Sequence, residues 1–141
     1  MHIQQFHHFA LVVPALDPAV AWYRDLLGFR PERRFGFTDA GVEIAHLVND
    51  AGVRLELIQQ AGAVAGPDAG RDVFAALETQ GAKHVGFLVP DVDAAARELR
   101  DRGVEIVADV TAVPPAGVRN FWVRDVAGNL IEFNQWLDEP A

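Results

Sequence analysis

An internal repeat constrains this chain more than any other feature of its 141 residues. The segments HHFALVVP and KHVGFLVP resemble each other, and each is followed by helix signals. Each is also followed, further along the chain, by an apolar segment with one acid in it, LELIQ in the first copy and IEFNQ in the second. The spacing is the same for both features, because 76 positions separate His8 from His84 and 76 separate Glu56 from Glu132. We therefore predict one structural module used twice.

The composition limits the classes of protein that this chain can belong to. Half of its residues are hydrophobic and 23% are charged, which is ordinary for a globular protein large enough to build a core. A net charge of −8 argues against nucleic acid or an anionic membrane as partner. Since cysteine is absent, a metal site must use nitrogen and oxygen ligands. The start MHIQQF has no signal-peptide pattern and no apolar stretch approaches the roughly 20 residues of a membrane span, so a cytoplasmic protein is expected.

The first module is expected to span residues 1–60 and to run strand, helix, then three strands. Alternating apolar residues predict a strand over residues 3–13, with His8 on the face opposite its buried side chains. Asp17 is expected to cap the following helix, with Pro18 at its first position and Gly28 as a left-handed cap at its end. The three remaining strands are expected at residues 30–37, 42–48 and 53–60, separated by glycine turns.

Residues 61–81 are interpreted as a linker followed by a short helix. Residues 61–70 are rich in Ala and Gly, and residues 71–80 have Val73, Phe74 and Leu77 at helical spacing, which predicts that these three face inward.

The second module is expected over residues 82–136, with a tail at 137–141. Asp93 takes the place of Asp17 as helix cap, and the helix should cover residues 94–102. Besides the strand around His84, strands are expected at residues 104–108, 118–123 and 129–135.

Four repeat-equivalent residues are candidate metal ligands. Each lies on the strand face opposite the strongest apolar alternation, so all four point away from the expected helices. If the helices cover the apolar face of each sheet, the other face is free to curve into a cup. Imidazole and carboxylate side chains in such a cup suit a divalent ion such as Ni, Co, Zn, Mn or Fe. The predicted ligands are His8, Glu56, His84 and Glu132.

The other histidines are weaker candidates. His7 lies on the face of Phe9 and aligns in the repeat with Lys83, which makes His8 the better choice. His46 could line the site or support a ligand, and a packed histidine is equally consistent with its position. His2 lies near the terminus and indicates nothing.

These features together resemble the vicinal oxygen chelate superfamily, which includes glyoxalases, bleomycin resistance proteins and extradiol dioxygenases. The similarity covers nearly the whole chain and is most specific in the phrases WYRDLLGF and AGNLIEF. It implies an α+β fold of two βαβββ modules, whose curled mixed sheets form a metal-binding cup with ligands at the four positions above. It also implies a homodimer, with the site either within one chain or across the interface.

Two members of the superfamily look most similar. The His, Glu, His, Glu set resembles bacterial glyoxalase I, but that enzyme typically carries an Arg four residues after the first His, where this chain has Val12. Gln60 likewise stands where glyoxalase I has an Asn. Losing a cation opposite a glutathione carboxylate removes a strong charge-assisted bond. The segments RDVFAALETQG and HVGFLVPDV instead look similar to methylmalonyl-CoA epimerase.

The leading hypothesis is a lyase or isomerase that moves a proton next to a carbonyl through a metal-bound enolate or enediolate. Glu132 or Glu56 would act as the base, and the substrate would carry vicinal oxygens or an acyl thioester. Two alternatives stay open. One is an Fe(II)-dependent dioxygenase of the same superfamily, and the other is a bleomycin-resistance-type protein that binds a small molecule without turnover.

Overall fold

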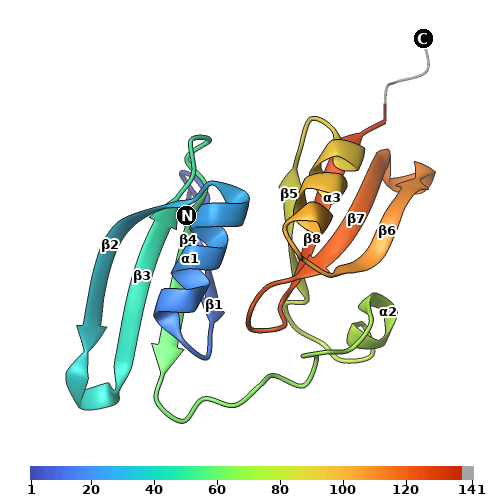
Figure 1. The fold of residues 1–141 in the computed structure, drawn as a ribbon. Helices are drawn as coiled ribbons and strands as arrows, with labels where there is room; N and C mark the ends of the chain where they lie inside the picture. Colours follow the sequence, from blue (N-terminus) through green and yellow to red (C-terminus); the bar gives the residue numbers. More distant parts are fainter. Residues whose placement is uncertain (138–141) are drawn as a thin grey trace. The chain divides into compact units, whose positions relative to one another are not determined.

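The computed structural model describes residues 1–137 and divides into two units, Met1–Ala65 and Gly66–Ala141 (Figure 1). Each unit contains one four-stranded mixed sheet and a main helix in the order strand, helix, strand, strand, strand. The predicted α+β class with two βαβββ modules is confirmed. Except for residue 137, the expected tail lies outside the described residues. No helix within the described part of the chain is long and apolar enough to cross a membrane.

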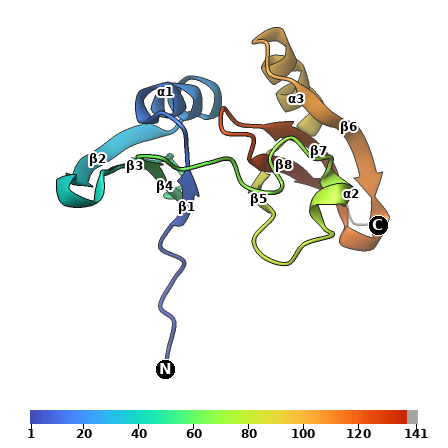
Figure 2. The same ribbon diagram turned by 90° about the horizontal axis from the view of Figure 1, so that it is seen from below.

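The first unit has the strand order β1-β4-β3-β2, with β1 parallel to β4 and the other pairs antiparallel. Its helix α1 lies on one face of this sheet (Figure 2). That face is the apolar one, because Ala19 and Tyr23 of the helix and Leu55 and Leu57 of β4 are all fully buried. The elements are β1 (Phe9–Val12), α1 (Leu16–Leu27), β2 (Arg30–Phe37), the 3₁₀ turn η1 (Thr38–Ala40), β3 (Val42–Val48) and β4 (Arg54–Gln60).

The second unit repeats this plan with the strand order β5-β8-β7-β6. Its core contains the fully buried Phe121 and Ile131, with Ala96 and Leu99 of α3 also buried. The elements are α2 (Val73–Ala76), β5 (His84–Leu88), α3 (Val92–Asp101), β6 (Ile106–Val113), the 3₁₀ turn η2 (Pro114–Ala116), β7 (Val118–Arg124) and β8 (Leu130–Trp136).

The two units also share one hydrogen bond at equivalent positions. The backbone N–H of Leu16 donates to Oε1 of Gln59 at 2.7 Å, and that of Val92 donates to Oε1 of Gln135 at 3.0 Å. The two bonds occupy equivalent positions 76 residues apart. In each unit a glutamine of the last strand satisfies an N–H in the first turn of the helix, which would otherwise lack a partner.

The predicted helix starts were wrong by two residues. The helix α1 has Ala15 as its N-cap without a side-chain cap, and α3 has Asp91 as its N-cap. Asp17 and Asp93 lie instead in the first turns of the helices, where a negative charge is favourable beside the helix dipole. Gln59 satisfies the first turn of α1, and in α3 Gln135 is joined by the Asp91 side chain, which accepts from the backbone N–H of Ala94. A capping side chain at Asp17 or Asp93 is therefore not needed.

Three other elements differ from the prediction by more than one residue. The helix expected at residues 71–80 is a single turn, α2, whose Phe74 and Leu77 are 82% and 59% exposed rather than inward. So short a segment has little cooperative helix stability. The first strand runs only from Phe9 to Val12, and its register with β4 begins at the Phe9–Leu55 pair, one residue after the start of β4. The strand expected at residues 104–108 runs from 106 to 113.

A half-buried ion pair links Asp68, near the start of the second unit, to Lys83 just before β5. Nζ of Lys83 lies 2.6 Å from Oδ2 of Asp68 and 2.6 Å from Oγ1 of Thr79. The hydrogen bond from Lys83 lowers the pKa of Asp68 below its ordinary value of 3.8.

Asp68→Asn is expected to destabilise the protein at neutral pH and to lose that effect in acid. A depressed folded-state pKa adds stability above the unfolded pKa and loses it as pH falls through the folded value. Urea unfolding at pH 7 should therefore show the variant to be less stable, and the difference should shrink below about pH 4. A difference that stays constant across this range would show that the carboxylate charge contributes nothing.

Candidate metal centre

In the first unit, His8 and Glu56 lie side by side on one sheet face. The register of β1 with β4 places Ala10 beside Glu56, and His8 precedes β1 by one residue. Nε2 of His8 is 3.9 Å from Oε1 of Glu56. Because Leu55 and Leu57 are turned to the helix, strand alternation turns Glu56 to the other face, as the sequence predicted.

In the second unit, His84 and Glu132 form the equivalent pair. His84 is the first residue of β5, and the parallel register of β5 with β8 places Gly86 beside Glu132. Nε2 of His84 is 3.4 Å from Oε2 of Glu132. Ile131 is fully buried on the helix side of β8, so Glu132 faces away from the core in the same manner as Glu56.

Each glutamate has a second partner on the neighbouring strand. Nε2 of His46 lies 2.6 Å from Oε2 of Glu56, and Nδ2 of Asn120 donates to Oε1 of Glu132 at 2.6 Å. The sequence raised His46 as a possible supporting residue. It gave no indication of Asn120, which stands between Arg119 and Phe121 in β7.

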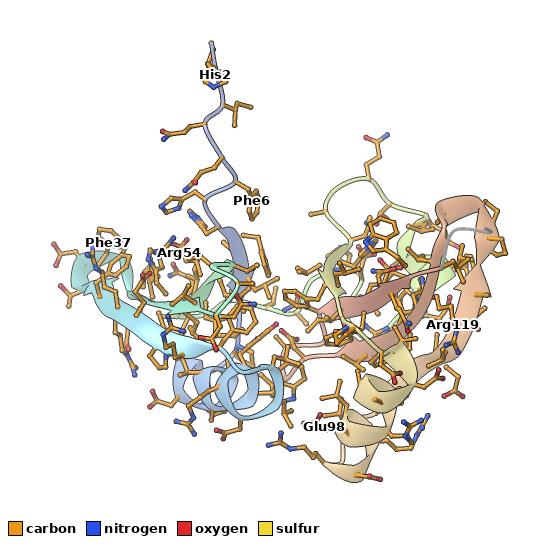
Figure 3. All side chains as sticks on the ribbon, turned by 90° about the horizontal axis from the view of Figure 1, so that it is seen from above. His2, Phe6, Phe37, Arg54, Glu98 and Arg119 are labelled. Carbon is orange, nitrogen blue, oxygen red and sulfur yellow. The ribbon has the colours of Figure 1, made fainter. Side chains whose placement is uncertain are left out.

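His7 supports His8 rather than replacing it. Its Nδ1 lies 2.6 Å from Nδ1 of His8, so one of these two nitrogens carries the shared hydrogen. That contact occupies Nδ1 of His8 and leaves its Nε2 on the side of Glu56. The N-terminal segment extends away from the strands of the first unit, with His2 near its far end (Figure 3).

Aromatic side chains pack against two of these histidines. The His84 ring meets Trp122 edge-on at 4.7 Å between centroids, and His46 meets Phe35 edge-on at 5.3 Å. Such packing restricts ring orientation and supplies an apolar surround.

The donor set of each unit fits a divalent metal ion as half of a site. Two nitrogen or oxygen ligands about 2.1 Å from one ion, in tetrahedral arrangement, lie roughly 3.4 Å from each other. The His84–Glu132 pair matches this separation at 3.4 Å, and the His8–Glu56 pair is wider at 3.9 Å. Within residues 1–137 no group of three or more His, Asp or Glu side chains is arranged to hold an ion. Each unit therefore brings together one His–Glu pair of candidate ligands, called a half-site below.

The chain is similar to known proteins in sequence and in fold. The chain is 24% identical over 136 residues to the human mitochondrial methylmalonyl-CoA epimerase, covering 95% of this chain and 75% of that protein. Among solved structures, a glyoxalase family protein from Enterococcus faecalis superposes with a TM-score of 0.80 at 19% identity, covering 95% and 99% of the two chains. The trypanothione-dependent glyoxalase I of Leishmania major gives 0.71 at 20% identity, covering 94% and 87%. The family model matches residues 7–127, and the chain belongs to the Glyoxalase/Bleomycin resistance protein/Dioxygenase superfamily.

Proposed function

We propose that the protein is a divalent-metal-dependent lyase or isomerase that transfers a proton at a carbon next to a carbonyl. His8, Glu56, His84 and Glu132 would hold the ion. The observation that carries the proposal is the pair of His–Glu half-sites at repeat-equivalent positions, each on the sheet face away from its helix. Ni, Co, Zn, Mn or Fe would suit these nitrogen and oxygen donors.

A bound ion would supply Lewis-acid stabilisation of negative charge on the substrate oxygens. Side chains of the protein, rather than the ion, would transfer the proton. A carboxylate beside the reacting carbon can take a proton and return it, and Glu56 and Glu132 are the carboxylates of the two half-sites. Both side chains are 17% exposed, which leaves them reachable by a small molecule while limiting the water around them. Trp122 and Phe35 pack edge-on against the rings of His84 and His46 and restrict their orientation.

An acyl thioester suits the chain better as substrate than a glutathione adduct. Val12, which is 51% exposed, stands where glyoxalase I presents a cation to glutathione, and a valine cannot make that bond. The similarity to a methylmalonyl-CoA epimerase points the same way. A homodimer is the proposed form of the enzyme, by resemblance to the superfamily.

The proposal is tested by proton exchange into deuterated water. The metal-loaded protein is expected to replace the C2 hydrogen of methylmalonyl-CoA with deuterium, read by mass spectrometry, faster than the chelated protein does. A parallel reaction with methylglyoxal and glutathione tests the glyoxalase activity. If neither reaction exceeds its chelated control with any of the five metals, the proposed chemistry is wrong.

A further inference from the structure

The two oxygens of each glutamate are engaged differently. Oε1 of Glu132 accepts from Asn120 at 2.6 Å, while its Oε2 faces Nε2 of His84 at 3.4 Å. In the first unit, Oε2 of Glu56 meets His46 at 2.6 Å, while its Oε1 faces His8. One oxygen of each carboxylate is thus held within the sheet, and the other is left toward the histidine of the half-site.

The two holding residues come from different places in the repeat. His46 pairs directly with Glu56 across β3 and β4. The residue directly opposite Glu132 is Trp122, and Asn120 reaches Glu132 from two positions further along β7. The repeat equivalent of Asn120 is Ile44, and that of His46 is Trp122. In both units one carboxylate oxygen is therefore held by a side chain of a neighbouring strand, but the two holding side chains do not occupy equivalent positions. Duplication of the module alone does not produce this similarity.

The burial of Asn120 supports a role for it in holding the Glu132 carboxylate. Asn120 is 9% exposed although it lies on the sheet face of Glu132, opposite the face of its fully buried strand neighbour Phe121. A buried amide costs free energy unless it is hydrogen-bonded, and its Nδ2 group can only donate. The bond to Oε1 satisfies this donor and fixes the plane of the Glu132 carboxylate at the same time.

We infer that Asn120 and His46 are positioning residues, which fix one carboxylate oxygen of Glu132 and of Glu56 so that each glutamate offers a single oxygen to the metal. This inference rests on the proposed function, since it concerns the ion of that site. Hydrogen-bond partners of metal ligands commonly change metal affinity by about 10- to 100-fold when removed. Asn120 should show the larger effect, because it is more buried than His46, whose side chain is 19% exposed.

The test compares Asn120→Leu with Asn134→Leu in the full chain. Asn134 lies on β8, two residues from Glu132 and on the same sheet face, and it pairs across the strands with Asn120. Competition with a chromophoric chelator for Co²⁺ should show binding about 10- to 100-fold weaker for Asn120→Leu and nearly unchanged for Asn134→Leu. The visible absorption of bound Co²⁺ should also shift for Asn120→Leu alone, because the spectrum reports ligand geometry. His46→Leu should weaken binding less.

Measurements on the metal-free protein distinguish a loss of Co²⁺ binding caused by unfolding from one caused by the missing hydrogen bond. Thermal unfolding identifies any variant that loses Co²⁺ only because it unfolds, and Asn120→Ser then serves as a smaller replacement. The side-chain amide resonance of Asn120 should move on Glu132→Gln in the absence of any ion. If the wild type binds no Co²⁺ but this resonance moves, the proposed function fails and the positioning contact stands. Unchanged Co²⁺ affinity and spectrum in a folded Asn120→Leu protein would overturn the inference.

Discussion

Replacing Glu132 or Glu56 by Gln is expected to lower turnover by about 10²- to 10⁴-fold, the range that a positioned general base contributes. The amide keeps the size of the side chain but cannot accept the substrate proton and is a poor metal ligand. Each glutamate also occupies a half-site in which it faces a histidine. The measurement is deuterium incorporation into methylmalonyl-CoA at saturating metal, so that loss of the base is seen apart from weaker metal binding.

Two matched variants control for indirect effects. Glu105→Gln removes the same charge from an exposed residue ahead of β6, outside both half-sites. Tyr23→Phe changes a fully buried residue of α1. Both should keep turnover close to that of the wild type. If Glu132→Gln and Glu56→Gln are as active as these controls, neither glutamate carries the proton, and the base must be sought elsewhere.

His8→Ala and His84→Ala are each expected to weaken metal binding by more than about 100-fold, because loss of a direct ligand should exceed the loss of a supporting partner. The effect should also be similar for the two, since they occupy equivalent places in the two units. Isothermal titration with Ni²⁺ and Co²⁺ measures it directly, without a substrate.

The neighbouring histidines provide the comparison. His2→Ala should leave affinity unchanged, because His2 lies near the far end of the N-terminal segment. His7→Ala should weaken binding only modestly, since His7 contacts Nδ1 of His8 without facing Glu56. A larger loss for His7→Ala than for His8→Ala would reverse the choice of ligand made from the repeat.

Strand positions could be predicted well from the sequence because two local signals agree there. Alternation of apolar residues indicated which side chains of each strand face the core, and glycines indicated where the turns lie. The predicted strands at 30–37 and 42–48 match β2 and β3 residue for residue. The turn between them ends at Gly41, which adopts the left-handed conformation at φ 64° that favours glycine.

Helix starts were less predictable because the residues that decide them lie far away in the chain. Gln59 and Gln135 reach the first turns of α1 and α3 across a sequence separation of 43 residues. A pattern of Asp followed by Pro is a local signal, and it placed the cap of α1 at Asp17 instead of Ala15. In α1 the tertiary hydrogen bond stands in place of a side-chain cap, whereas α3 also has the local cap of Asp91.

The candidate site shows the same division between local and tertiary information. The faces of Glu56 and Glu132 follow from strand alternation and could be predicted. Asn120 could not, because its bond to Glu132 crosses diagonally between strands and its repeat equivalent, Ile44, has no such role to copy. Comparing the two copies of the repeat therefore points to candidate ligands that both copies share, and it misses supporting residues that occur in one copy only.

The stoichiometry of metal binding tests the central claim most directly. If two half-sites complete one centre, titration of the chelator-treated wild type should reach one ion per chain, whether the halves come from one chain or from two copies. The same titration of the variant with His8, Glu56, His84 and Glu132 all replaced by Ala should show no specific binding. Two equivalent ions per chain, or undiminished binding by that variant, would contradict the four-ligand centre.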